Sequence, residues 1–194
     1  MKIIGLTGGI GMGKSTAAAA FRRARIPVFD ADATVHRLQA RGGRAVRAIE
    51  AAFPGTTAQG AVDRPALRRA VLGKAEALTT LEAILHPMVR QEERAFVARA
   101  RRAGSRAVVL DIPLLFETGG RKTDRVVVVS APRAVQMQRV RKRRKMSASD
   151  IEAVLARQMP DAEKRRRADL VIRTGLSRFH ALRALRRLIK ELRA

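Results

Sequence analysis

The sequence is poor in the residues that several classes of protein require. Its 194 residues include no cysteine, which excludes disulfides and thiolate metal sites and fits a reducing cytoplasm. Aromatic residues make up only 3%, with no Trp and no Tyr, so stacking platforms for single-stranded nucleic acid are not expected. No apolar run reaches membrane-spanning length, and no apolar segment at the N-terminus indicates a signal peptide. We therefore expect a cytoplasmic protein without a membrane partner.

Acidic residues are also scarce, because 17 Asp and Glu face 41 Lys and Arg, for a net charge of +24. The densest basic stretches are residues 139–145 and 164–167. Such charge indicates either a nucleic-acid surface or a site for polyphosphate ligands. Arginine is spread along most of the expected helices, however, so solvated helix faces account for most of the charge. We assign a function only to the stretch 139–145.

The most informative positive feature is a phosphate-binding loop at residues 8–15, Gly-Gly-Ile-Gly-Met-Gly-Lys-Ser. An apolar segment at 2–7 precedes it and reads as a buried strand, and an alanine-rich segment at 16–22 follows it and reads as a helix. Glycines let successive backbone N–H groups point at phosphate oxygens, and the helix adds the partial positive charge of its N-terminus. Lys14 can reach the β- and γ-phosphates, and the Ser15 hydroxyl can bind Mg²⁺. A glycine-rich turn without a ligand is the weaker alternative.

The rest of the chain alternates between strands and helices, and its 46% hydrophobic content suits one domain with room for a small inserted subdomain. This order predicts an α/β protein, with a three-layer α/β/α arrangement around a five-stranded parallel sheet. Helical patterns dominate from 33 to 103, with breaks at 53–55 and before Pro65 and Pro87. Pro132 lies just inside a further helix, and Ser177 can cap a last helix that ends near Leu192. The expected strands are residues 2–7, 26–29, 107–110, 125–130 and 170–172.

Two aspartates, Asp30 and Asp32, follow the second expected strand. Ligands of open α/β sheets bind beyond the carboxyl ends of the strands, so a carboxylate here is placed to act as a general base for an attacking hydroxyl. The alternative role is to cap the helix that starts near residue 33. Two aspartates allow both roles, and the sequence does not assign them.

A third aspartate, Asp111, ends the third expected strand. A carboxylate at the end of a strand often holds Mg²⁺ in proteins with this loop, frequently through water. The alternative is a turn residue before Pro113. Glu117, a few residues further on, is ambiguous.

The chain resembles the dephospho-CoA kinase family over essentially its whole length, through five short segments. The loop alone specifies only a nucleotide binder, whereas Asp-Ala-Asp, His-Pro and Pro-Leu-Leu-Phe-Glu are the discriminating parts. The resemblance implies transfer of the γ-phosphoryl group of ATP to the ribose 3′-hydroxyl of dephospho-CoA with Mg²⁺. It also implies a fold similar to that of nucleoside monophosphate kinases. The segments are residues 5–11, 30–33, 85–90, 111–117 and 168–172.

The same resemblance implies a domain plan and roles for individual residues. The plan has a core at about 1–32 and 104–194, a helical CoA-binding insertion at about 33–103, and a lid at about 138–160. Asp32 matches the catalytic aspartate of the family, and the ATP loop falls on Gly11, Met12, Gly13, Lys14, Ser15 and Thr16. The metal ligands remain those expected from the loop chemistry above, Ser15 and Asp111. The lid arginines, which would stabilise charge on the transferring group, fall most plausibly on Arg139 and Arg143.

On the acceptor side the resemblance implies His86, Arg90 and Leu114. The other role for His86 is that of a helix-break residue before Pro87. Arg157 and Gln158 follow the lid arginines along the chain.

Three places depart from the family pattern. Met12 stands where the family usually has serine, and we expect its side chain to point away from the phosphate cradle. Arg173-Thr174 replaces an Asp-Asn pair that many members carry near the adenine. Residues 121–124, Arg-Lys-Thr-Asp, are unusually basic.

Three other functions compete with this interpretation. A GTPase would need Asn-Lys-x-Asp after a strand, and residues 121–124 lack the Asn and precede their strand. A nucleic-acid-associated ATPase would use the positive charge but would need more aromatic residues and a second motor domain. Another small-molecule kinase of the same fold would differ only in its acceptor. We expect dephospho-CoA as partner, no obligate nucleic acid, and a monomer or weak homo-oligomer.

Overall fold

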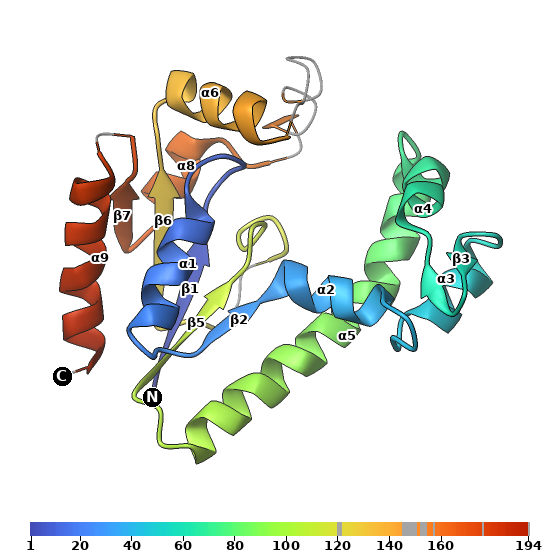
Figure 1. The fold of residues 1–194 in the computed structure, drawn as a ribbon, viewed down its shortest axis with the longest axis horizontal. Helices are drawn as coiled ribbons and strands as arrows, with labels where there is room; N and C mark the ends of the chain where they lie inside the picture. The colour runs from blue at the N-terminus through green and yellow to red at the C-terminus, as the bar shows by residue number, and fades with distance from the viewer. Residues whose placement is uncertain (120–121, 145–150, 152–154, 157, 176, 194) are drawn as a thin grey trace. The chain divides into compact units, whose positions relative to one another are not determined.

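A computed structural model describes residues 1–119, 122–144, 151, 155–156, 158–175 and 177–193 (Figure 1). The chain divides into two compact units. The first unit comprises residues 1–29 and 99–194, and the second comprises residues 30–98. Within the described residues, no helix is long and apolar enough to cross a membrane.

A five-stranded sheet forms the centre of the first unit. Its strands are β1 (Lys2–Thr7), β2 (Val28–Asp30), β5 (Ala107–Asp111), β6 (Arg125–Ser130) and β7 (Leu170–Arg173), in the order β2-β5-β1-β6-β7. The pairs β1–β5, β1–β6 and β6–β7 are parallel, and the first aligns Leu6 with Asp111. This confirms the α/β fold and the five-stranded sheet predicted from the sequence. The second strand begins two residues later than expected.

Helices cover the sheet because its strands are apolar on both faces. Among the described residues, the helices of this unit include α1 (Lys14–Arg23), α6 (Arg133–Arg144), α8 (Asp161–Arg166) and α9 (Arg178–Arg193). Ile4, Val109 and Val127 belong to one buried cluster with residues of α1 and α9, such as Phe21 and Leu185. The intervening Val108, Leu110 and Val128 are buried as well. Such continuous burial is characteristic of parallel strands with helices on both faces.

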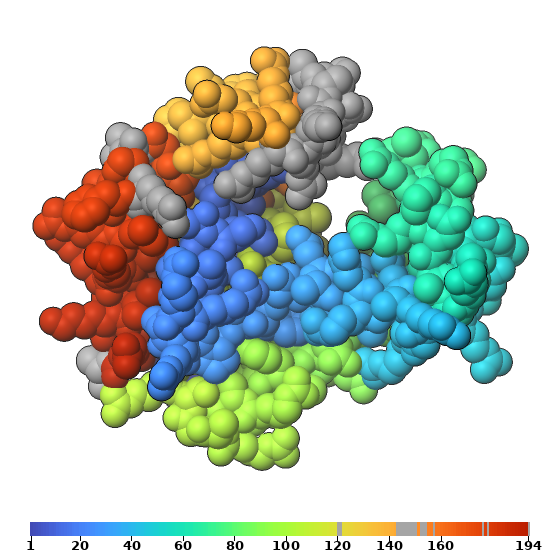
Figure 2. All heavy atoms as spheres, viewed as in Figure 1, coloured from blue at the N-terminus to red at the C-terminus, as the bar shows by residue number. Residues whose placement is uncertain are grey.

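The positions at which α6 and α9 begin follow from local chemistry. The α9 helix starts after Ser177, whose hydroxyl oxygen accepts a hydrogen bond from His180 N at 3.0 Å, so the predicted cap is confirmed. The α6 helix begins at Arg133, one residue after Pro132, whose carbonyl accepts a bond from Gln136 N. Segment 1–25 lies between α6 and α9 on the visible face of this unit (Figure 2).

The second unit is mostly helical. It contains α2 (Ala31–Gln39), α3 (Val46–Ala52), α4 (Arg64–Val71) and most of α5 (Ala75–Arg102). A short antiparallel hairpin, β3 (Thr57–Ala58) with β4 (Ala61–Val62), lies between α3 and α4. The sequence pattern did not indicate this hairpin, because strands of two residues are too short to show an alternation of apolar and polar residues.

The predicted helix break before Pro87 is wrong, since α5 runs for 28 residues with Pro87 inside it. A proline removes one backbone hydrogen bond and disfavours the helical conformation of the preceding residue. Here Leu85 and Val89 are buried on either side of it. Their burial and the remaining hydrogen bonds of the long helix offset the loss at one position.

Candidate functional site

The phosphate-binding loop leaves the central strand β1 and ends at the first turn of α1. Gly11 and Gly13 have φ angles of +74° and +94°, which residues with a Cβ rarely adopt. A Cβ on Gly11 would also lie 2.6 Å from Cγ2 of Val140 in α6. These glycines therefore allow a tight loop whose backbone amides lead into the unpaired N–H groups of the helix start.

Met12 turns inward from this loop. It is 3% exposed and belongs to the main core cluster, and its sulfur lies 3.0 Å from the backbone N of Ala131, which donates to it. The Met12 carbonyl accepts a hydrogen bond from the Thr174 hydroxyl at 2.6 Å. Met12 thus anchors the loop to the segments that follow β6 and β7, while its side chain contributes to the core.

The ammonium group of Lys14 is held by Asp111. Lys14 Nζ lies 2.6 Å from Asp111 Oδ1, and the two side chains are 16% and 4% exposed. The sheet register explains this pair, because Asp111 ends β5 beside Leu6 of β1, just before the loop. The structure therefore brings together two predicted site residues that are 97 positions apart in the sequence.

Oxygen ligands suitable for Mg²⁺ are present around this pair. Ser15 is exposed in the first turn of α1, with Thr16 beside it, and Asp111 supplies a carboxylate. The described residues contain no group of three or more His, Cys, Asp or Glu that could hold a metal alone. Because Mg²⁺ usually keeps several waters and binds substrate phosphates with only one or two protein ligands, this sparse oxygen set fits it.

Two glutamines that the sequence analysis did not identify as site residues support the loop from outside. Gln136 of α6 donates from Nε2 to the Ile10 carbonyl at 2.8 Å, and Gln158 accepts at Oε1 from Ile10 N at 3.2 Å. The partners are 126 and 148 positions apart. Glutamine has no distinctive local pattern, so no signal in the sequence pointed to Gln136, and the family resemblance named Gln158 without giving it a role.

Arg139 of α6 points to the end of β7. Its Nη2 donates to the Thr174 carbonyl at 2.6 Å, and its Nη1 donates to the Thr174 hydroxyl at 3.1 Å. The departure at Thr174 thus joins Arg139 to the loop carbonyl of Met12. The Arg143 side chain and much of the predicted lid, at 145–150, 152–154 and 157, lie outside the described residues.

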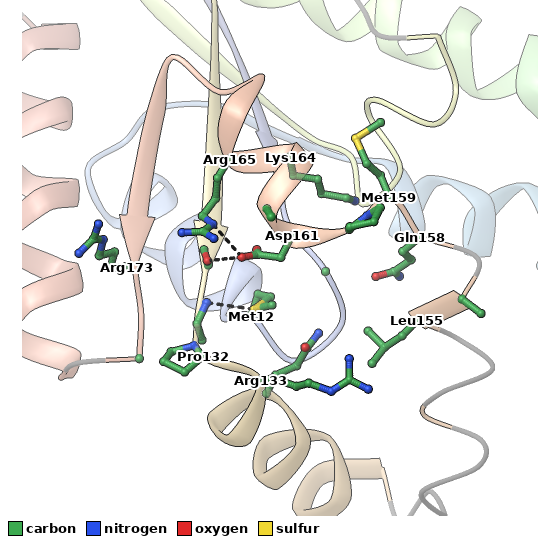
Figure 3. Close-up of a pocket in the computed structure, with 18 residues that line it drawn as sticks. Met12, Pro132, Arg133, Leu155, Gln158, Met159, Asp161, Lys164, Arg165 and Arg173 are labelled. Atoms are coloured by element: carbon green, nitrogen blue, oxygen red, sulfur yellow. Dashed lines mark hydrogen bonds and ion pairs between the residues drawn. The ribbon is translucent and has the colours of Figure 1, made fainter.

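A cavity of about 770 Å³ lies beside the loop, between α6, α8 and residues 155–156 and 158–160 (Figure 3). Met12 and Gly9 line it from the loop, and Arg133, Arg165 and Arg173 bring positive charge. Asp161 is drawn with dashed contacts to two neighbours, Ser130 Oγ at 2.8 Å and Arg165 Nε at 3.1 Å. This cavity includes neither Lys14 nor Ser15 among its lining residues, so it is not the phosphate cradle itself.

In the second unit, Asp30, the last residue of β2, and Asp32 have different surroundings. Asp30 is the N-cap of α2 and accepts a hydrogen bond at Oδ1 from Ala33 N at 2.9 Å. Asp32 lies in the first turn of α2 and is exposed, and within the described part of the chain its carboxylate makes no hydrogen bond or ion pair. The capping role therefore falls on Asp30, which leaves Asp32 available to a ligand.

The three residues expected on the acceptor side lie in both units. His86 is half-buried and Arg90 is exposed, one turn apart on α5. Leu114 lies in the turn after β5, in the first unit, and is 36% exposed.

Asp124, from the near match to a guanine-binding motif, has a structural role. Its Oδ2 accepts from Ile3 N at 2.6 Å, and its own N donates to the Ile3 carbonyl. This carboxylate therefore ties the start of β6 to β1, which argues against the GTPase alternative.

Comparisons with known proteins agree with this geometry. The family model described as "Dephospho-CoA kinase" matches residues 2–177. A dephospho-CoA kinase of Gluconobacter oxydans is 52% identical over 100% of this chain and 98% of its own length. One of Paramagnetospirillum magneticum is 62% identical over 85% of this chain and 78% of its own length. The crystal structure of TT1252 from Thermus thermophilus is 38% identical, with a TM-score of 0.84 over 98% of this chain and 97% of that one. The loop, the sheet and these relatives together show that the chain belongs to the dephospho-CoA kinase family.

Proposed function

We propose that this protein transfers the γ-phosphoryl group of ATP to the ribose 3′-hydroxyl of dephospho-CoA and releases ADP and coenzyme A. Family membership over residues 2–177 supports the reaction. The observation in the structure that carries the proposal is the Lys14–Asp111 pair at the start of α1. It puts one fixed positive charge where the loop would hold the β- and γ-phosphates of ATP.

On the donor side, the loop and Lys14 have separate tasks. The backbone N–H groups of Gly11 to Thr16 would donate hydrogen bonds to the phosphate oxygens, and Lys14 would follow the transferring group as a point charge. Ser15 and Asp111 would hold Mg²⁺, which when bound neutralises charge on the β- and γ-phosphate oxygens. The ion pair with Asp111 orients the lysine before ATP arrives.

On the acceptor side, Asp32 is proposed as the general base. The ribose oxygen forms a bond to the γ-phosphorus while the bond from that phosphorus to the β–γ bridging oxygen breaks. The hydroxyl proton passes to the Asp32 carboxylate, and ADP leaves. Since the transition state is loose, the carboxylate mainly aligns the hydroxyl and accepts the proton late. Its exposure, and the use of Asp30 as the cap, support this assignment.

Arginines and acceptor contacts complete the proposed site. Arg139 and Arg143 would stabilise negative charge on the moving phosphoryl group. In this structure Arg139 is bonded to Thr174, so direct contact with a phosphate requires it to exchange at least one of these bonds. His86, Arg90 and Leu114 are proposed to bind dephospho-CoA. The domain plan, the cytoplasmic location and the monomeric or weakly oligomeric state remain predictions from the sequence.

An acceptor screen with Mg-ATP tests the function directly. ADP formation is measured with dephospho-CoA, shikimate, nucleosides, gluconate and RNA as separate additions. We expect stimulation by dephospho-CoA and by no other addition. Turnover that responds to RNA would favour the nucleic-acid-associated ATPase, and turnover that responds to another small molecule would keep the kinase and change its acceptor.

A further inference from the structure

A buried lysine in α8 lines the cavity described above but belongs neither to the phosphate-binding loop nor to the proposed catalytic residues. Lys164 is 1% exposed, and its Nζ lies 2.7 Å from Oε1 of Glu117, in the turn after β5. Two further ion pairs involve residues of α8, Arg165–Asp161 within the helix and Glu163 with Arg167 at its C-cap, and their arginine side chains are about half exposed, at 46% and 51%. Only the pair at Lys164 is withdrawn from water within the described part of this helix.

Stability alone is a weak reason for this pair. Removing two charges from water costs several kcal/mol per ion, and apolar replacements of buried ion pairs are often neutral or stabilising. Glu117 Oε2 is also buried and has no hydrogen-bond partner among the described residues, so part of that cost is uncompensated. The contacts of the pair indicate another benefit.

From Lys164, one set of bonds leads to the start of the phosphate-binding loop. Lys164 Nζ donates to the Pro113 carbonyl at 3.4 Å, and the same carbonyl accepts from the Thr7 hydroxyl at 2.9 Å. Thr7 is the last residue of β1, immediately before the first loop glycine. The buried ammonium group therefore fixes a carbonyl that also holds the entry to the loop.

From Glu117, the bonds lead to the middle of the loop. Glu117 Oε1 also accepts from Met159 N at 2.9 Å. The neighbouring Gln158 accepts at its side chain from Ile10 N at 3.2 Å. Figure 3 shows Lys164, Met159 and Gln158 along one side of the cavity that Met12 lines. Together with the chain between Thr7 and Ile10, these bonds form a closed circuit around the back of the loop.

We propose that Lys164 and Glu117 are positioning residues for ATP binding, which act by holding Gln158 against Ile10 and Pro113 against Thr7. The pair keeps the loop in its phosphate-binding conformation before ATP arrives, so less conformational freedom is lost on binding. Neither residue touches the reacting atoms in this account. The inference builds on the proposed function only in taking ATP as the ligand of the loop.

The test separates positioning from folding by replacing the pair with apolar side chains of similar length. In Lys164→Met/Glu117→Met no buried charge is left unpaired, and we expect a melting temperature within about 4 °C of the wild type. The acceptor for Met159 N and the donor to Pro113 are both lost, so we expect the Kd for ATP to rise about tenfold. Gln158→Ala cuts the circuit at the loop without touching a buried charge and should raise the Kd similarly. Arg167→Met, at the C-cap of the same helix and in an exposed pair, is the matched control and should leave the Kd for ATP unchanged.

Binding is measured by calorimetry with ATP alone, so the outcome does not depend on which acceptor the enzyme uses. The triple variant, which adds Gln158→Ala to the methionine pair, should bind no more weakly than either parent, because both changes cut one circuit. Normal ATP affinity in the methionine pair would overturn the proposal and leave the ion pair a purely structural feature. If that variant does not fold, Gln158→Ala decides: unchanged affinity in it overturns the proposal equally.

Discussion

The two units of the molecule bury different kinds of polar group. Among the described residues, the buried charged side chains, Asp111 and Lys164, lie in the unit that carries the phosphate-binding loop. The polar side chains buried in the second unit are neutral: Thr34, Gln39 and Thr56. A buried charge is costly unless it is paired, and each of these two has an oppositely charged partner. The first unit accepts this cost where it must hold charged groups in fixed places.

The two units also differ in how far apart in the sequence the partners of a polar contact lie. Around the loop, hydrogen bonds join residues about a hundred positions or more apart, as in Lys14–Asp111 and Ile10–Gln158. In the second unit, Thr34 bonds the carbonyl of Asp30 and Thr56 bonds that of Phe53, four and three positions away. The exposed bonds of Arg44 to Gln91 and Glu92 have a longer span. The difference suggests that the first unit preorganises the chemistry, while the second contributes individual side chains on locally built helices.

The largest effect is expected at Asp32, because this residue is proposed to take part in the reaction directly. It would be the contribution of the second unit to the chemistry. Asp32→Asn keeps the size of the side chain but removes the charge that accepts the proton. We expect kcat to fall by roughly two to four orders of magnitude with ATP affinity little changed. Steady-state kinetics and a separate ATP-binding measurement check this.

Asp30 is the matched control for Asp32. Asp30→Asn keeps a good capping residue for α2, and we expect a much milder loss of kcat. If the Asp30 variant is inactive while the Asp32 variant stays active, the roles are reversed. If both stay active, the proposed general base is wrong.

Features of the fold that depend on residues close together in the sequence were predictable from it. The loop at 8–15, the apolar strands and the cap at Ser177 depend on neighbouring residues, and the structure has them where the pattern placed them, apart from the two-residue shift at the start of β2. The uninterrupted helix at Pro87 was mispredicted because packing around Leu85 and Val89 outweighs a local preference.

The supports of the candidate site were not predictable in this way. Gln136 and Gln158 meet the loop only because the sheet order and the path of the chain bring them there. Lys164 reads in the sequence as one of four consecutive basic residues, yet it is the one that is buried. Single-residue identities do not show such distant pairings.

Lys14→Ala tests the contribution of the first unit. It removes the positive charge proposed to follow the transferring phosphoryl group, and we expect a loss of rate on the order of a hundredfold or more. The melting temperature is measured alongside, because the buried Asp111 carboxylate loses its ion pair with Lys14. A near-normal kcat would mean that this loop is not the catalytic one.

Arg139 tests whether position or bulk charge matters in the basic first unit. Arg139→Ala should lower kcat/KM by about tenfold, as expected for one lost charge-assisted contact. Arg186→Ala removes the same charge from an exposed position on α9 and should have little effect. Equal losses in the two variants would reduce the role of Arg139 to bulk charge.

The smallest effect is expected at Glu50 in the second unit. Hydrogen bonds from the Thr57 hydroxyl, and then from the Gly55 backbone, lower the pKa of the Glu50 carboxyl from its ordinary value. A lowered pKa stabilises the folded state above the ordinary carboxyl pKa, and that stabilisation is lost as pH falls through the lowered value. Thr57→Val should therefore raise the pKa of Glu50. The free energy of unfolding should then depend less on pH in the acid range.

NMR titration of the Glu50 side chain in the wild type and in Thr57→Val measures this shift. ATP affinity should not change, because these residues belong to the second unit and to no proposed site. An unchanged Glu50 pKa would contradict the local account of this unit.

The central claim is that the γ-phosphoryl group of ATP is transferred to the 3′-hydroxyl of dephospho-CoA. Phosphorus NMR of the product formed from Mg-ATP and dephospho-CoA tests it most directly. We predict one new phosphomonoester resonance, coupled to the ribose 3′ proton and equal in amount to the ADP formed. ADP and inorganic phosphate without that resonance, or a phosphate on another hydroxyl, would contradict the account.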